Sequence, residues 1–161
     1  MSKILISGYY GFANAGDEAM LTAIIESLRQ VEKNVELTVL SGNPEDTAAK
    51  HQVCSVYRFN PLGIIRAMKD SELIISGGGS LLQDVTSKRS LLYYLSIIGL
   101  GKFFGKKVML FAQGIGPIRA KWARKLTSLV CNEADLITVR DSESAAELIE
   151  MGVKPEKITV T

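Results

Sequence analysis

Short apolar runs and amphipathic stretches alternate along the chain. The apolar runs are rich in β-branched residues, as is typical of strands buried in a sheet, and lie at residues 3–7, 35–40, 52–57, 73–75, 107–112, 136–139 and 157–161. Helices are predicted between them at residues 44–52, 60–69, 90–104, 119–132 and 140–152, and from Asp17 onward through an apolar stripe (Ala19, Leu21, Ile24, Ile25, Leu28). Because strands and helices alternate, the sequence predicts an α/β, Rossmann-like fold, a mainly parallel sheet with helices on both faces.

Four loops leave the predicted strands with unusual residues, at 8–17, 77–84, 113–117 and 140–144. In open α/β sheets, ligands bind outside the carboxyl ends of the strands, so these loops are expected to share one edge. None carries a standard nucleotide fingerprint, because Gly8, Gly11 and Gly16 have the wrong spacing for GxGxxG and no GxxxxGK[ST] occurs. The pattern therefore predicts a polar crevice without naming its ligand.

The three consecutive glycines at residues 77–79 follow the strand at 73–75. Glycine runs cost backbone entropy and occur where a chain turns tightly or approaches something closely. With Leu81, Leu82 and an apolar helix behind it, the loop is expected to lead into a helix N-terminus that suits a phosphate or carboxylate. A plain strand-to-helix turn is the alternative.

Composition limits the classes of function. The chain has 161 residues, enough for one domain, with 47% apolar and 22% charged residues and a net charge of +2, too small to indicate nucleic-acid binding. Cys54 and Cys131 lie among apolar neighbours and are expected to be buried free thiols, as in a reducing cytoplasm. No metal-ligand spacing and no signal peptide are visible, and the apolar run at 91–100 is too short to cross a bilayer.

Two charged residues at the loop edge are the best candidates for chemistry. Asp17, at a helix start, is a candidate base, or simply a capping residue. Arg140, between a strand and a helix, is a candidate clamp for a carboxylate or phosphate, or else pairs with Asp141 or Glu143. For Asp84, a capping role on the helix after its loop and a functional role both stay open.

The single histidine, His51, lies in a polar stretch away from these loops. It is expected to be a solvated surface residue, so an imidazole acid or base is not expected from this chain.

Taken together, four motifs resemble those of the polysaccharide pyruvyl transferase family, closest to the CsaB type. They are Gly-Tyr-Tyr-Gly-Phe-x-Asn-x-Gly-Asp-Glu-Ala from residue 8, Ser-Gly-Gly-Gly-Ser-Leu-Leu-Gln-Asp from 76, Gln-Gly-Ile-Gly-Pro from 113 and Val-Arg-Asp-x-x-Ser from 139. The resemblance implies one half of a two-Rossmann-domain (GT-B) enzyme that transfers pyruvyl from phosphoenolpyruvate to a cell-wall saccharide as a ketal. For the CsaB type it implies a lipid-linked saccharide acceptor.

The resemblance also assigns roles to residues. It implies Asp17 as base, Arg140 as anion clamp, and loop residues that shape the saccharide acceptor side of the cleft: Gly8, Phe12, Asn14, Gly16, Gly77, Gly78, Gly79, Ser80, Gln113, Gly114 and Gly116. It implies no cofactor besides the donor phosphoenolpyruvate. Residues 1–161 are then the N-terminal domain, inactive alone, and a second domain with the proton donor follows Thr161.

Several expectations stay open at this stage. The apolar helix at 91–104 either touches lipid or a lipid-linked acceptor or is a core helix, so a cytoplasmic location at the inner membrane face and a homodimer both remain options. Two other functions also stay open: a sugar- or phosphate-binding module without catalysis, and half of a nucleotide-sugar glycosyltransferase.

Overall fold

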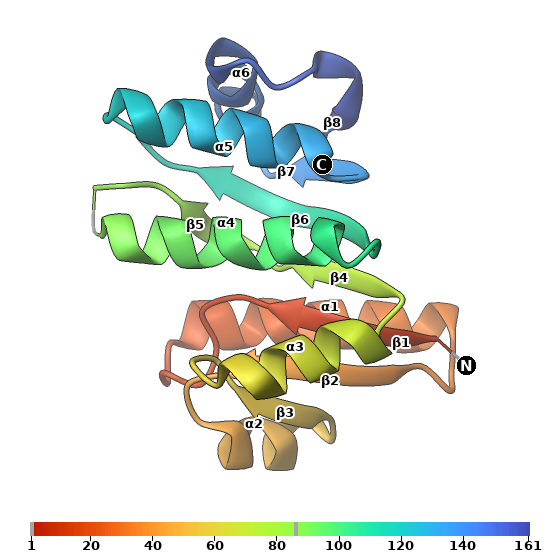
Figure 1. Cartoon of the computed structure of the whole chain (residues 1–161). Helices are drawn as coiled ribbons and strands as arrows, with labels where there is room; N and C mark the ends of the chain where they lie inside the picture. The colour runs from red at the N-terminus through yellow and green to blue at the C-terminus, as the bar shows by residue number, and fades with distance from the viewer. Residues whose placement is uncertain (1, 86) are drawn as a thin grey trace.

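A single parallel sheet organises the chain in the computed structural model, which describes residues 2–85 and 87–161 (Figure 1). Its strands follow the order β3-β2-β1-β4-β6-β7-β8, and β5 pairs with β6 beside this path. They are β1 (Lys3–Ser7), β2 (Glu36–Ser41), β3 (Cys54–Tyr57), β4 (Leu73–Ser76), β5 (Gly79–Leu82), β6 (Lys107–Ile115), β7 (Leu136–Val139) and β8 (Ile158–Val160). The described pairs are all parallel, which confirms the predicted fold class.

The helices cover both faces of the sheet. They are α1 (Ala15–Val31), α2 (Pro44–His51), α3 (Pro61–Asp70), α4 (Lys88–Phe103), α5 (Lys121–Glu133) and α6 (Ser142–Met151), with a 3₁₀ turn η1 (Pro155–Lys157). Figure 1 shows α1 and α2 on one face and α3, α4 and α5 on the other. Five helices begin at a side-chain cap that accepts a backbone N–H from three residues on, at Asn14, Asn43, Asn60, Ser87 and Asp141.

Successive side chains of the strands point to opposite faces and build two cores. Ile4 and Ile6 of β1 belong to the core under α1, whereas Leu5 belongs to the larger core under α3 and α4. Within the stripe predicted for α1, Leu21, Ile24 and Ile25 are buried, but Ala19 is exposed and lies outside the core.

Helix α4 is a core helix over most of its length. Its buried residues are Leu91, Tyr94, Leu95, Ile97, Ile98 and Gly101. This burial accounts for its apolar composition without a lipid contact. In residues 2–85 and 87–161, no helix combines the length and apolarity needed to span a bilayer.

The three glycines do not lead into a helix, which corrects the sequence prediction. Strand β4 pairs with β6 from Lys107 to Leu110, and after Gly77 and Gly78 the chain continues as β5, which pairs with Gln113 and Ile115 of the same strand. The glycines therefore form a kink between β4 and β5, which pair one after the other with the same side of β6. Helix α4 begins only at Lys88, so its N-terminus does not directly follow the glycines.

The neighbouring strand, β6, is longer than predicted for the same reason. Residues 113–115, expected in a loop, belong to β6, because they pair with β5 on one side and, at Gln113, with Val139 of β7 on the other. Ala112 takes a positive φ of 49° at the irregularity between Leu110 and Gln113. Strands β5 and β6 thus run past the end of β4 and form a wall at the carboxyl edge.

Replacing Gly77 by alanine tests the packing of the kink. A Cβ there would collide with the Tyr10 hydroxyl and lie 3.2 Å from the Ser7 carbonyl oxygen. We expect Gly77→Ala to lower the free energy of unfolding by about 1–3 kcal/mol in urea titrations. Because the clash is with the hydroxyl, the loss should shrink when Tyr10→Phe is the background.

Gly99→Ala is the matched control. Gly99 lies inside α4, and a Cβ there meets nothing within 4 Å, so the change should be neutral or stabilise by up to ~1 kcal/mol. An equal loss at both glycines would contradict the proposed contact with Tyr10.

Candidate functional site

The candidate site lies at the carboxyl edge of the sheet, where the strand order reverses. Strand β1 has β2 on one side and β4 on the other, which makes this point the usual ligand crevice of a doubly wound sheet. Asp17 follows β1, Ser80 follows the β4 kink and Arg140 follows β7. The structure brings the three together, because Gly79 and Ser80 lie between the carboxylate and the guanidinium.

Asp17 lies in the first turn of α1, where Asn14 caps the helix and accepts the Asp17 N–H at 3.2 Å. The cap is thus Asn14, and the Asp17 carboxylate is free to face the wall. A Cβ on Gly79 would lie 3.1 Å from that carboxylate, so glycine lets the two approach. Burial, and secondly the neighbouring charge of Glu18, raises the pKa of Asp17. A raised pKa makes this carboxylate a better base than its place at a helix N-terminus suggests.

Arg140 reaches back over β6 toward the glycine kink. Its Nη2 donates to the Ser80 hydroxyl at 3.0 Å, and its guanidinium covers Gly114, where a Cβ would collide with it. It also pairs with Asp141, Nε to Oδ2 at 3.6 Å, the partner that the sequence left open. The side chain is 54% exposed, so most of its donors still face solvent and can meet an anion.

Two buried polar side chains support the rim from below. The Gln113 amide nitrogen donates to the carbonyl oxygens of Ser76 (3.0 Å) and Gly77 (2.5 Å) and to the Ser76 hydroxyl (3.2 Å). The ring of Tyr10 is fully buried against Gly8 and Gly77, where side chains would collide with it. Gln113, Gly8 and Gly77 thus shape the site without a position on its surface.

The remaining predicted residues also fall into two groups, exposed residues at the rim and buried residues beneath it. Phe12, Asn14, Gly16 and Ser80 are exposed at the rim, whereas Gly78 is buried against Met20 and Gly114 beneath Arg140. Gly116 packs against Gln83, whose Cβ would lie 2.5 Å from a Cβ at that position. All the predicted residues are therefore near the edge, but only part of them can touch a ligand.

A hollow of about 370 Å³ opens beside Asp17. It is lined by Tyr9, Asp17, Ser80, Leu81, Gln83, Ser90 and Tyr94. Burial raises the pKa of Tyr94, so its hydroxyl stays protonated at neutral pH. The lining combines two aromatic rings with hydroxyl, amide and carboxylate groups.

Arg58 is a buried cation that sequence reasoning missed. It is 5% exposed, and in residues 2–85 and 87–161 no carboxylate lies within ion-pair distance of it. Instead its guanidinium carbon lies 4.5–5.9 Å from the centroids of five rings: Tyr9, Phe12, Phe59, Tyr93 and Tyr94. Cation–π attraction thus offsets part of the cost of burying the charge and ties the first loop to the segment before α3 and to α4.

His51 is not a solvated surface residue, contrary to the sequence prediction. Its side chain is 9% exposed, and Nε2 lies 3.2 Å from Oε2 of Glu18. The other oxygen of Glu18 accepts the N–H of Gly11 at 2.9 Å. The last residue of α2 therefore contacts the first turn of α1, and Glu18 joins it to the first loop, a contact that the linear sequence does not show.

Asp84 caps a different helix from the one that follows it. Its carboxylate accepts the N–H groups of Arg119 and Ala120, each at 3.0 Å, at the start of α5. Helix α5 has no side-chain cap of its own at Ala120. The bonds from Ala120 and then Arg119 lower the pKa of Asp84.

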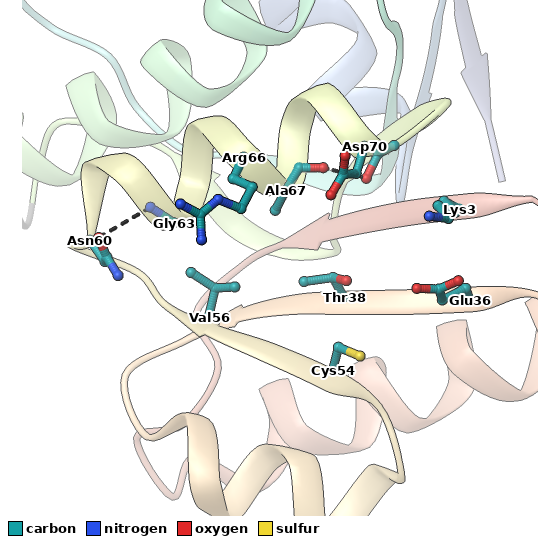
Figure 2. A pocket seen from close by; sticks show the side chains of 11 residues that line it. Lys3, Glu36, Thr38, Cys54, Val56, Asn60, Gly63, Arg66, Ala67 and Asp70 are labelled. Carbon is teal, nitrogen blue, oxygen red and sulfur yellow. Dashed lines mark hydrogen bonds between the residues drawn. The ribbon is translucent and has the colours of Figure 1, made fainter.

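A second hollow, of about 440 Å³, lies away from this edge, between α3 and strands β1 to β3 (Figure 2). Figure 2 shows Cys54 and Thr38 on the strands and Arg66 on α3 around it. Cys54 is exposed here, so the prediction of two buried thiols is correct only for Cys131. Lys3 and Glu36 at its far end lie at the amino ends of β1 and β2, opposite the candidate site.

Comparison with known families gives one match. The model of the family described as polysaccharide pyruvyl transferase matches residues 14–161. No protein of curated function matches the sequence.

Solved structures share the fold at low sequence identity. HepE of Anabaena, in complex with UDP and glucose, superposes with a TM-score of 0.64 at 12% identity over 99% of this chain and 44% of its own. The galactosyltransferase WaaB of the lipopolysaccharide outer core gives 0.57 at 16% over 98% and 44%. UDP-GlcNAc 2-epimerase from Neisseria meningitidis, bound to UDP-GlcNAc, gives 0.60 at 13% over 100% and 46%. The chain therefore spans less than half the length of these proteins and has the fold of one half of a GT-B enzyme.

Removal of Asp84 tests its role as the cap of α5. Its lowered pKa means that its contribution to stability is complete above the usual aspartate range and is lost as pH falls through the folded-state pKa. We expect Asp84→Ala to lower the melting temperature at neutral pH, and the difference from wild type to shrink on acidification. Asp70→Ala, at an exposed aspartate of α3, is the control. A pH-independent difference would argue against the cap.

Proposed function

Because the chain belongs to the polysaccharide pyruvyl transferase family, we propose that it forms the saccharide acceptor side of an active site that transfers pyruvyl from phosphoenolpyruvate. The observation that carries the proposal is the approach of Asp17 and Arg140 to the two ends of the Gly79–Ser80 segment. One group suits a base and the other an anion clamp. The acceptor is a saccharide, and a lipid-linked cell-wall precursor of the CsaB type fits the same proposal.

The reaction joins two sugar hydroxyls to C2 of phosphoenolpyruvate. The first hydroxyl adds to C2 while a proton is delivered to the methylene carbon, which becomes a methyl group. The second hydroxyl then displaces inorganic phosphate and closes the ketal. Each hydroxyl loses one proton, and Asp17, with its raised pKa, is placed to accept a proton from the acceptor in the hollow.

Arg140 supplies the positive charge in this half. The exposed part of its guanidinium suits the carboxylate or the phosphate of the donor, both of which fit its planar pair of donors. The described residues offer no exposed imidazole at the rim, since His51 is held by Glu18. We therefore assign the proton donor to a second domain, and expect residues 1–161 to bind but not to turn over substrate alone.

A second function stays open because of the solved structures. HepE and the epimerase were crystallised with UDP or UDP-sugars, so half of a nucleotide-sugar enzyme is the competing proposal. Titration with phosphoenolpyruvate and with UDP-glucose separates the two. If the two-domain protein bound UDP-glucose but did not bind phosphoenolpyruvate, the proposed pyruvyl transfer would be wrong.

Asp17→Asn tests the proposed base in a chain that carries both domains. The amide keeps the shape of the side chain but cannot accept the proton, so we expect kcat to fall by about 10²–10⁴-fold with little change in the KM for phosphoenolpyruvate. The readout is phosphate release coupled to ketal formation. Asp46→Asn, on α2, is the matched control.

The pH profile gives an independent check. Because the charge of Glu18 raises the pKa of Asp17, Glu18→Gln should move the acidic limb of kcat to lower pH. An unmoved limb would place the titrating base elsewhere.

Arg140→Lys tests the anion clamp. The ammonium keeps the charge but loses the paired donors, so the KM for phosphoenolpyruvate should rise about tenfold, which corresponds to roughly 1.4 kcal/mol. Arg66→Lys, beside the second hollow, is the control. If both variants leave this KM unchanged, Arg140 does not bind the donor.

A further inference from the structure

We propose that the stacked rings of Tyr9 and Phe12 are a platform for the sugar ring, with the acceptor pyranose lying against Tyr9 in the hollow beside Asp17. The inference rests on the proposed function for its saccharide acceptor and names residues that bind it. Tyr9, Ser90 and Tyr94 become acceptor-binding residues in addition to those that the sequence motifs indicate.

The geometry of the two rings is the first observation. Tyr9 and Phe12 stack with centroids 4.3 Å apart and planes 17° apart, and each is 41% exposed. Tyr9 lines the hollow and Phe12 does not. Phe12 thus covers one face of Tyr9, and it also packs on Gly42, where a side chain would collide with the Phe12 ring. Of the two rings, Tyr9 therefore offers exposed aromatic surface to the hollow, and Phe12 supports it.

The second observation is that the platform is held in place before any ligand arrives. The guanidinium of Arg58 lies 5.9 Å from the Tyr9 centroid and 5.2 Å from that of Phe12. The backbone of Arg58 is itself held in place. Its N–H donates to the Ser41 carbonyl at 3.0 Å, and its carbonyl accepts a hydrogen bond from the Tyr93 hydroxyl at 2.8 Å. A ring that is already immobile loses little conformational entropy on binding.

The third observation is the chemistry around the hollow. A pyranose has a face of C–H groups, which are attracted to the negative face of an aromatic ring, and a rim of hydroxyls. The hollow offers the Tyr9 ring for the face, and for the rim the Asp17 carboxylate, the hydroxyls of Ser80, Ser90 and Tyr94, and the Gln83 amide. With the pyranose on Tyr9, a hydroxyl on its edge lies toward Asp17, the base of the proposed reaction.

Saturation-transfer NMR with the 161-residue chain tests the platform. The probes are methyl pyranosides of the gluco, galacto and manno series and their 2-acetamido forms, without phosphoenolpyruvate. We expect transfer to the C–H protons of one ring face in at least one glycoside. Tyr9→Phe keeps the ring and should bind as wild type, whereas Tyr9→Leu should weaken binding about tenfold.

Tyr57→Leu is the matched control, because Tyr57 is also exposed, at 47%, and does not line the hollow. Circular dichroism checks that each variant is folded, and the restriction of saturation to one ring face with the wild-type chain keeps the test decisive if Tyr9→Leu does not fold. The inference is overturned if no glycoside receives saturation, if Tyr9→Leu and Tyr57→Leu bind alike, or if uridine but no glycoside binds at Tyr9.

The two proposals fail separately. Glycoside binding that depends on Tyr9, in a two-domain protein that does not transfer pyruvyl, would end the proposed function and leave the platform standing. Pyruvyl transfer with an acceptor KM unaffected by Tyr9→Leu would do the reverse.

Discussion

The buried amide of Gln113 holds the carboxyl edge of the sheet in its observed shape. At the glycine kink, the pairing of β4 and β5 with β6 is interrupted between Leu110 and Gln113. The Gln113 side-chain nitrogen donates to two backbone carbonyls there, those of Ser76 and Gly77. A buried carbonyl without a partner costs about 1–3 kcal/mol, so the hydrogen bonds from this side chain stabilise the kink. The kink in turn positions Gly79 beside Asp17 and Ser80 beside Arg140.

The kink also sets which side chains the site can accept. Tyr10 fills the space between Gly8 and Gly77, so both positions must lack a side chain. The Tyr10 hydroxyl and the side-chain amide oxygen (Oε1) of Gln113 are buried, and in the described part of the chain neither has a hydrogen-bond partner. These unpartnered polar atoms lower the stability of this edge, as is common at functional sites. Gly79 and Ser80 are then carried by strand β5 of the sheet rather than by a loop.

Sequence periodicity was sufficient for the strands and helices but not for the irregular edge. The strand at residues 3–7 and the helix after Asp17 were predictable because burial imposes a local repeat. The glycines were misassigned because the pairing of β5 with β6 depends on residues more than 30 positions away. Neither Arg58 nor His51 carries a local signal, since their partners lie on other elements. The four motifs lie at one edge of the sheet, as predicted, but they did not separate exposed residues from the buried residues that support them.

The cap of α5 by Asp84 links two parts of the chain during folding. Most helices here carry their own cap and can form their first turn from local contacts alone. Helix α5 cannot, because the carboxylate that satisfies its first N–H groups arrives from the segment after β5. The first turn of α5 is therefore stable only where the segment after β5 is folded against it, which couples these two parts of the chain into one cooperative unit.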